Sequence, residues 1–386
     1  MTLHLFNNKY IIEIPLLISA ICMFICFQPY FVWGTTYHVI AQVIISGILL
    51  LHIEKKPGDL SPNLLIFLLY IFIILRSSYS DFGNISILTF IPLVFAQKDF
   101  LYKLFKYFVV VFALSMGVSL VMYILVKIMG MNMPNIIIDP LNDIKENAYY
   151  HAYFMLVTIV SHGIDSTRFF GPFDEPGVVG TIAAALLTAQ RLDLKKWYNI
   201  LILVAGIFSF SMFFYIIILS YLVLFASRRG KILSAIALIL AFSLPVITNN
   251  ESFNLYVIDR VTSGNIDNRT IDSYDAWFQE FMHSSGFIWG LGGDVHIKYN
   301  EGGASYKDII TDFGIVFFVL YCLSFIWRAF KMIKDKKRIL LYAVIVAAIL
   351  YQRPFITIFG YFFLLYIPCV ALSEKYDSHE LQQLSK

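Results

Sequence analysis

The chain has 386 residues, of which 59% are hydrophobic and 14% are charged, and its mean hydropathy is +0.73. A soluble domain carries about 25% charged residues, so this composition excludes an ordinary soluble protein and indicates that lipid surrounds most of the chain. The formal net charge of +3 comes without a basic block interleaved with aromatic residues, which argues against nucleic acid as a partner.

Apolar stretches predict about twelve transmembrane helices and an all-α polytopic membrane protein, because a helix needs roughly 20 apolar residues to span a bilayer and fewer where it is short or broken. The predicted spans are residues 11–32, 38–53, 63–76, 85–97, 107–127, 176–190, 198–209, 211–226, 232–248, 309–327, 339–352 and 355–372. No internal repeat or Gly/Ser linker divides the chain, so we expect residues 1–386 to form one integral membrane domain.

The distribution of basic residues sets the predicted orientation, since Lys and Arg concentrate in cytoplasmic loops. With twelve spans and both termini inside, 20 of the 29 Lys and Arg residues fall on the inner side, although its loops are the shorter ones. Residues 198–226 form one long apolar run that is broken only by the two serines of the segment 208–211. Two short spans fit the run better than one, because a single span would place a cluster of basic residues outside.

Two predicted outer loops, about 128–175 and about 249–308, are far longer than ordinary connections, and loops of this length are usually functional or disordered. The second contains an amphipathic helix pattern in which Ile271, Tyr274, Phe278 and Phe281 lie three, four and three residues apart, with Trp277 beside them. We expect this helix to lie in the outer membrane interface.

The most distinctive local feature is the segment from Arg168 to Gly177, which ends the first large loop and opens the next span. Pro176 suits the first position of a helix, and Asp174 or Glu175 is placed to cap the free N–H groups that follow. Gly171, followed by a proline, predicts a tight turn that brings Arg168 back over the start of this helix.

An arginine beside a helix N-terminus is a natural anion site, because the guanidinium binds phosphate bidentately and the helix end adds partial positive charge. Arg168 is therefore a candidate phosphate ligand. The alternative is that Arg168 pairs with Asp174 or Glu175 and only stabilises the turn.

The second loop adds candidates of the same kind: Arg260, Arg269, Trp277 and Asp312. Arg353 lies at the last predicted outer turn, where an interfacial anchor is the alternative role. Taken singly, each loop arginine has the role of a solvated charge as its alternative, and for a single loop arginine this is the more common role. The histidines and cysteines show no metal-ligand spacing, so we expect no metal site and no cofactor.

The pattern Arg168-x-x-Gly171-x-Phe173-x-Glu175-Pro176-Gly177 resembles the O-antigen polymerase and O-antigen ligase family, the Wzy-type membrane glycosyltransferases of bacterial surface polysaccharides. The layout is similar too, since that family has ten to fourteen helices and two large periplasmic loops that supply functional arginines. In the second loop the resemblance rests on Arg260, Arg269, Trp277, Gly290-x-Gly292 and Asp312-x-Gly314.

The resemblance implies a multi-pass protein of the bacterial inner membrane that works on its periplasmic face as a metal-independent glycosyltransferase. It would move an oligosaccharide from undecaprenyl pyrophosphate to the growing O-antigen or capsular polysaccharide. Arg168, Glu175, Arg260 and Arg269 would act in catalysis. Gly171, Asp174, Trp277, Asp312 and Arg353 would bind substrate. Membrane lipids and a chain-length regulator protein are the further partners that it implies.

Three other functions stay open. The ligase branch of the family, which transfers glycan to a lipid core, typically carries a His shortly before the span after its second loop. Residues 304–308 contain none, which favours the polymerase. A flippase or other transporter usually has short loops and charges inside its helical bundle. A non-catalytic assembly protein is the last alternative.

The predicted topology can be checked by cysteine labelling. A cysteine placed at Asn142 or Asn300 should react with a membrane-impermeant reagent added to intact cells, because both positions lie in predicted outer loops. A cysteine at Asp335 should react only after the cells are opened. Labelling of the Asp335 position in intact cells would contradict the predicted sidedness.

Overall fold

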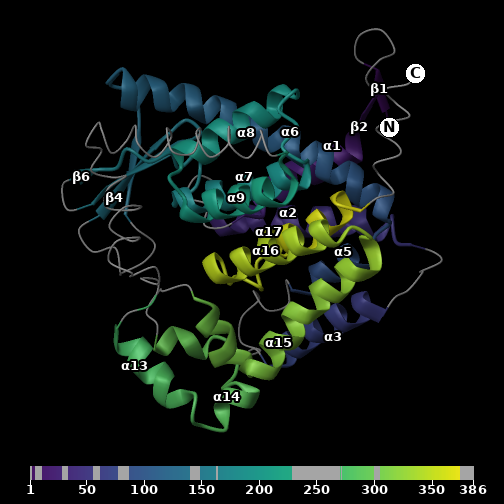
Figure 1. Ribbon diagram of the computed structural model, residues 1–386. Helices are drawn as coiled ribbons and strands as arrows, with labels where there is room; N and C mark the ends of the chain where they lie inside the picture. The colour runs from purple at the N-terminus through teal and green to yellow at the C-terminus, as the bar shows by residue number, and fades with distance from the viewer. Residues whose placement is uncertain are drawn as a thin grey trace.

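The computed structural model describes residues 2–4, 11–27, 34–54, 61–76, 87–139, 148–161, 164–227, 270, 272–299 and 305–373, and it is mostly helical (Figure 1). This part of the chain contains thirteen α-helices: α1 (Ile14–Ile25), α2 (Gly34–Leu50), α3 (Ser61–Arg76), α5 (Ile91–Phe95), α6 (Lys98–Tyr123), α7 (Pro176–Ala189), α8 (Trp197–Phe208), α9 (Met212–Phe225), α13 (Asp272–Phe281), α14 (Gly286–Trp289), α15 (Tyr306–Met332), α16 (Lys336–Gln352) and α17 (Phe359–Ala371). Three short turns of other helix types complete it: η1 (Ile87–Phe90), η2 (Ile124–Ile128) and η5 (Val295–Lys298).

Eleven of the twelve predicted spans coincide with helical segments, and the twelfth, 232–248, lies outside the described residues. The segment predicted at 85–97 is the shortest, since it consists of η1 and α5 only. Two helical stretches, Lys98–Ile128 and Tyr306–Met332, are long and apolar enough to cross a membrane. The other apolar helices are shorter, so the number of membrane crossings stays a prediction.

Loops that were predicted to carry the basic residues lie at one end of the helical bundle. Side-chain and backbone contacts join them pairwise across the bundle: Ile53 with Ala96, Tyr221 Oη with the Arg191 carbonyl at 2.7 Å, Arg338 Nη1 with the Leu372 carbonyl at 3.3 Å, and Lys103 Nζ with Glu13 at 2.7 Å. Tyr366, in the C-terminal half of α17, donates a hydrogen bond to Asn63 near the start of α3. These contacts bring the described parts of the loops together, and the side of a membrane on which they lie stays a prediction.

The described parts of both long loops lie at the opposite end of the bundle. In Figure 1 the strands β4 and β6 and the helix α13 lie at the left, away from the hairpin of β1 (Thr2–His4) and β2 (Ile11–Glu13). Arg76, the last residue of α3, donates to the carbonyls of Trp289 and Gly290, and so attaches the second loop to this end.

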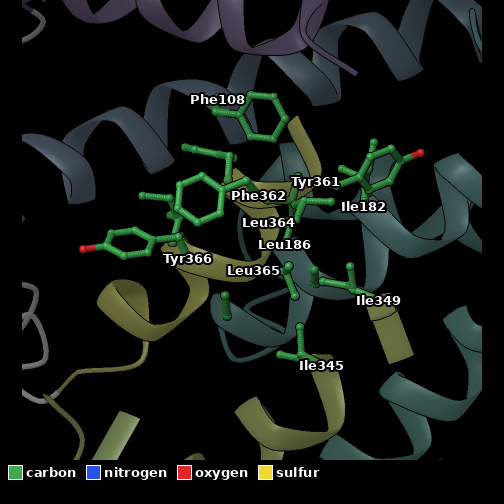
Figure 2. Close-up of a cluster of buried hydrophobic side chains, with 14 of the residues drawn as sticks. Phe108, Ile182, Leu186, Ile345, Ile349, Tyr361, Phe362, Leu364, Leu365 and Tyr366 are labelled. Carbon is green, nitrogen blue, oxygen red and sulfur yellow. The ribbon is translucent and has the colours of Figure 1, made fainter. Parts of the chain in front are cut away.

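Helices α7 and α17 form the centre of the fold, because every residue of both is buried. A helix that is apolar on all sides can be buried all round, and both sequences are of this kind. Figure 2 shows Phe362, Leu364 and Leu365 of α17 packed among side chains of α6, α7 and α16. The start of α7 is thereby held at a fixed place.

The expectation of an all-α fold is wrong for the first long loop. Its described part forms a four-stranded antiparallel sheet in the order β3 (Ile136–Ile138), β4 (Ala148–Tyr153), β5 (Leu156–Ser161) and β6 (Ile164–Asp165). The β-branched and aromatic residues of the half-apolar stretch 149–160 favour strands. Alternate residues on β4 and β5 face a small core of their own around Tyr150, Val157 and Phe170.

The amphipathic helix predicted in the second loop is confirmed as α13, but its apolar face does not lie open to lipid. Tyr274, Phe278 and Phe281 are buried against Ile310 of α15. The predicted stripe therefore serves to pack the loop onto the bundle. Ile271, the first residue of that stripe, lies outside the described residues.

Helix α15 is broken at Gly314, whose φ of +87° is left-handed, where the backbone of α14 crosses it. A Cβ on Gly314 would overlap the Ile288 carbonyl, and one on Gly290 would overlap the Asp312 carbonyl. The two main chains therefore touch, and hydrogen bonds of 2.8 Å and 2.9 Å run from the Leu291 and Gly292 amides to the Thr311 and Asp312 carbonyls.

Residues 197–225 form two helices, α8 and α9, as the charge distribution predicted. The contact between Tyr221 and Arg191 returns α9 to the end of the bundle where α7 finishes. The two helices pack closely at Gly206, because a Cβ there would overlap the ring of Phe214.

We therefore expect Gly206→Ala to lower the free energy of unfolding by about 1–3 kcal/mol through overpacking. Gly47→Ala is the matched control, since Gly47 is also helical and has nothing within 4 Å of its Cβ position. The control should gain up to about 1 kcal/mol from helix propensity. Thermal unfolding in detergent measures both variants, and equal melting temperatures would contradict the close packing.

Candidate functional site

The turn predicted at Gly171 is confirmed and is anchored to the sheet. Gly171 has a φ of +57°, which a residue with a side chain rarely adopts, and its carbonyl accepts the Val157 amide at 2.7 Å. Met116 of α6 lies within 3.1 Å of the position a Cβ would occupy. The turn therefore joins the sheet to the helical bundle directly before α7 begins.

Arg168 lies against the turn between α8 and α9. Its Nε donates to the Ser209 carbonyl at 3.1 Å and its Nη2 to the Phe210 carbonyl at 3.3 Å. Carbonyls at the end of a helix lack hydrogen-bond partners within the helix. The guanidinium group donates a hydrogen bond to each of these two neighbouring carbonyls. Sequence reasoning placed this side chain over the start of α7 and did not foresee the carbonyls.

Arg353 occupies the start of α7. It follows the last residue of α16, is 3% exposed, and forms an ion pair with Glu175. Its Nη2 lies 2.8 Å from the position that a Cβ on Gly177 would occupy, so only glycine leaves room for the guanidinium there. Among the described residues, the buried Nε of Arg353 has no hydrogen-bond partner.

Glu175 is the N-cap residue of α7 and Pro176 its first helical residue, as predicted. The Glu175 carboxylate makes no capping hydrogen bond, however, and pairs with Arg353 instead. Asp174, directly before it, is 7% exposed. The acidic pair therefore lies at the predicted place, with a different partner for Glu175.

Gln352 fastens the same helix start to the α8–α9 turn. Its Oε1 accepts a hydrogen bond of 2.7 Å from Thr181, and its Nε2 donates to Ser211 Oγ at 3.5 Å. A Cβ on Gly180 would overlap Ser211. Residues 352–353, the α8–α9 turn and the start of α7 therefore form one polar junction, the α7 junction, and Arg168 contacts it through Ser209.

The second loop is organised by Asp312. Its carboxylate accepts hydrogen bonds from the amides of Asp294 (3.0 Å) and His296 (2.9 Å), and lies 2.6 Å from His296 Nδ1. Asp312 therefore holds the loop that was predicted to bind substrate. Trp277 stacks on Tyr299 with ring centroids 4.0 Å apart. Arg260 and Arg269 lie outside the described residues.

The two regions meet at one aromatic contact. Tyr306, the first residue of α15, stacks on Tyr351 with centroids 5.9 Å apart, and Tyr351 precedes the Gln352-Arg353 pair. Sequence reasoning missed the His296–Asp312 pair and the Glu175–Arg353 pair. The partners are 16 and 178 residues apart, and no spacing rule connects them.

Among the described residues, no group of three or more His, Cys, Asp or Glu side chains is arranged to hold a metal ion. Comparison of the chain with protein-family models, with curated proteins and with solved structures gave no match. The function must therefore be argued from the residues themselves.

The His296–Asp312 pair should make the stability of the second loop depend on pH. Burial lowers the pKa of His296, but its hydrogen bond to Asp312 and the charges of Asp312, Asp308 and Asp294 together raise it above the ordinary 6.5. The stabilisation is therefore complete below about pH 6.5 and is lost as pH rises through the raised pKa.

His296→Gln should lower the melting temperature at pH 6 and have a smaller effect at pH 9, because glutamine keeps a hydrogen-bond donor but does not titrate. Melting curves of both proteins between pH 5.5 and 9 measure the difference. Parallel pH profiles would show that the pair contributes no titrating interaction.

Proposed function

We propose that the protein is a multi-pass membrane polymerase that joins lipid-linked oligosaccharide repeat units on the outer face of the bacterial inner membrane. The support for a membrane location is the 59% hydrophobic composition, the two long apolar helices, and the grouping of basic loops at one end of the bundle. The motif from Arg168 to Gly177, which resembles the polymerase and ligase family, lies at the other end.

The observation that carries the proposal is the buried guanidinium of Arg353 at the N-terminus of a fully buried helix. A helix start offers free N–H groups and partial positive charge to an anion, and Gly177 lets a ligand or guanidinium approach the backbone. Arg353 uses Nη2 on Glu175, and its buried Nε has no hydrogen-bond partner among the described residues. These features suit the pyrophosphate of an undecaprenyl-linked donor.

In the proposed reaction, a hydroxyl oxygen of the acceptor glycan bonds to the anomeric carbon of the donor. The bond from that carbon to the pyrophosphate oxygen breaks, its electron pair stays on undecaprenyl pyrophosphate, and the hydroxyl proton passes to a base. Charge develops on the leaving group, so positioned cations stabilise the transition state. We assign that role to Arg353 and Arg168, and the positioning of Arg353 to Glu175.

Arg353→Lys tests the assignment. Lysine keeps the charge but loses the planar fork, so polymer formation should fall roughly a hundredfold, about 3 kcal/mol in the transition state. Arg168→Lys should lower polymer formation by a comparable factor. Lysine is used because it keeps a cation at the position that pairs with Glu175, whereas alanine would remove the ion pair as well as the fork. The assay incubates purified protein with labelled lipid-linked repeat units.

Arg338→Lys, at the opposite end of the same helix α16, is the matched control and should leave the rate unchanged. Glu175→Gln keeps the hydrogen bond to Arg353 and should retain partial activity if Glu175 positions it; nearly complete loss would make Glu175 the base. Wild-type rates for both Arg353→Lys and Arg168→Lys would remove the pyrophosphate assignment.

One observation favours the ligase as a second candidate. The ligase branch carries a His before the span after its second loop, and residues 304–308 contain none. His296, however, contacts the Asp312 carboxylate near the start of α15 through its Nδ1. A His oriented by a carboxylate is the arrangement of a general base. The same assay with a lipid core added as a second acceptor decides: glycan on the lipid core indicates the ligase, and lengthened lipid-linked chains indicate the polymerase.

A further inference from the structure

A row of three aromatic rings lies on one face of strand β4. Tyr149, His151 and Tyr153 alternate along the strand, so their side chains point to the same side of the sheet. The ring centroids of Tyr149 and His151 are 5.2 Å apart, and those of His151 and Tyr153 are 6.2 Å apart. Ile137, which pairs with His151 in register, extends this face and is 64% exposed.

The aromatic row is not part of the sheet's own core. Residues of the other face, Tyr150 and Val157 among them, are buried with Phe170. On the row's own face the paired residues of β5 (Leu156, Thr158 and Val160) are buried as well, so the row forms the partly exposed margin of that face along β4. Tyr150 is 1% exposed, whereas its neighbour Tyr149 is 38% exposed. Tyr153 at the far end of the row packs partly against the helical bundle and so anchors it.

Polar side chains border the same face. Asn135 Oδ1 lies 2.7 Å from His151 Nδ1 and fixes that ring. Asp165 pairs in register with Val160, which in turn lies opposite Tyr149, so the carboxylate belongs to this face, and it forms an ion pair with Lys127. Burial, and then the charge of Asp165, raise the pKa of Tyr153.

We propose that this face of the sheet binds the sugar rings of the acceptor oligosaccharide. A sugar ring presents flat C–H faces and a rim of hydroxyl groups. Aromatic rings in a row stack against the faces, and amide, carboxylate and ammonium groups beside them bind the hydroxyls. The side chains on this face supply both kinds of contact.

The position of the row fits the same occupant. The Val157 amide bonds to the Gly171 carbonyl, so the sheet is fixed to the turn that immediately precedes Asp174 and the start of α7. A glycan on this face would extend from the α7 junction, and the subsite therefore rests on the proposed function. The ion pair of Asp165 with Lys127 carries no net charge, so it gives no attraction to an anionic bilayer surface and offers hydroxyl groups both an acceptor and a donor.

The test measures glycan binding without catalysis. The probe is the oligosaccharide cleaved by mild acid from the host's own lipid-linked repeat unit, which carries neither pyrophosphate nor lipid. Calorimetric titration into the full-length protein in nanodiscs should show that Tyr149→Ala weakens binding about tenfold, as truncation of an aromatic anchor does. Tyr149→Phe keeps the ring and should bind within about threefold of the wild type.

Phe154→Ala is the matched control. Phe154 lies in the turn of the same hairpin and is 74% exposed, but it does not belong to the row. Its binding should equal that of the wild type. Equal binding by the wild type and Tyr149→Ala, or an equal loss in Phe154→Ala, would overturn the proposal.

A bilayer contact is the competing explanation for exposed tyrosines, and Tyr149→Trp separates the two. After subtraction of the signal from the five native tryptophans, its emission should respond to the oligosaccharide. Quenching by bromine-labelled lipids without such a response would place the row in the membrane surface and overturn the subsite. If glycan binding depends on Tyr149 but the protein forms no polymer, the glycan site stands and the polymerase function is wrong. If the protein forms polymer but Tyr149→Ala binds the glycan normally, the polymerase function stands and the glycan site is wrong.

Discussion

A guanidinium buried to 3% exposure needs a compensating charge, and the ion pair of Arg353 with Glu175 meets that need where three elements converge. Removing the guanidinium from water is expensive, and its attraction to the half-exposed Glu175 carboxylate offsets the cost only in good geometry. The pair therefore constrains the start of α7, the end of α16 and the approach of the first loop together. The hydrogen bonds of Gln352 and Arg168 then extend the same junction to the α8–α9 turn.

The junction shows how a bundle of apolar helices can hold charged and polar groups at its edge. Helices α7 and α17 are buried on every side and give the charged pair a rigid support. Polar backbone at a helix break needs partners where water is scarce. Arg168 donates hydrogen bonds to the carbonyls of the α8–α9 turn. The arginine of the motif therefore stabilises this turn, while Arg353, distant in sequence, lies at the start of α7.

Local features of the chain were predictable from the sequence because their causes are local. Apolar runs gave the helices, the charge distribution gave the division into α8 and α9, and Pro176 and Gly171 gave a helix start and a turn. The sheet was not predicted, because residues 149–160 have only a half-apolar pattern, and their pairing into strands depends on contacts that the pattern does not show. The partners of Glu175 and Asp312 were not predicted either, since a carboxylate's choice of partner depends on packing between distant segments. The glycosyltransferase resemblance remains a proposal, resting on the motif.

The crossing of α14 over α15 has a consequence for how the sequence can vary. At Gly290 and Gly314 the obstacle to a side chain is the main chain of the opposite segment, which no substitution can shorten. A change at one glycine therefore cannot be rescued by a change at the other, in contrast to a pair of packed side chains that can trade volume. Neither glycine can therefore be replaced unless one of the two main-chain segments moves.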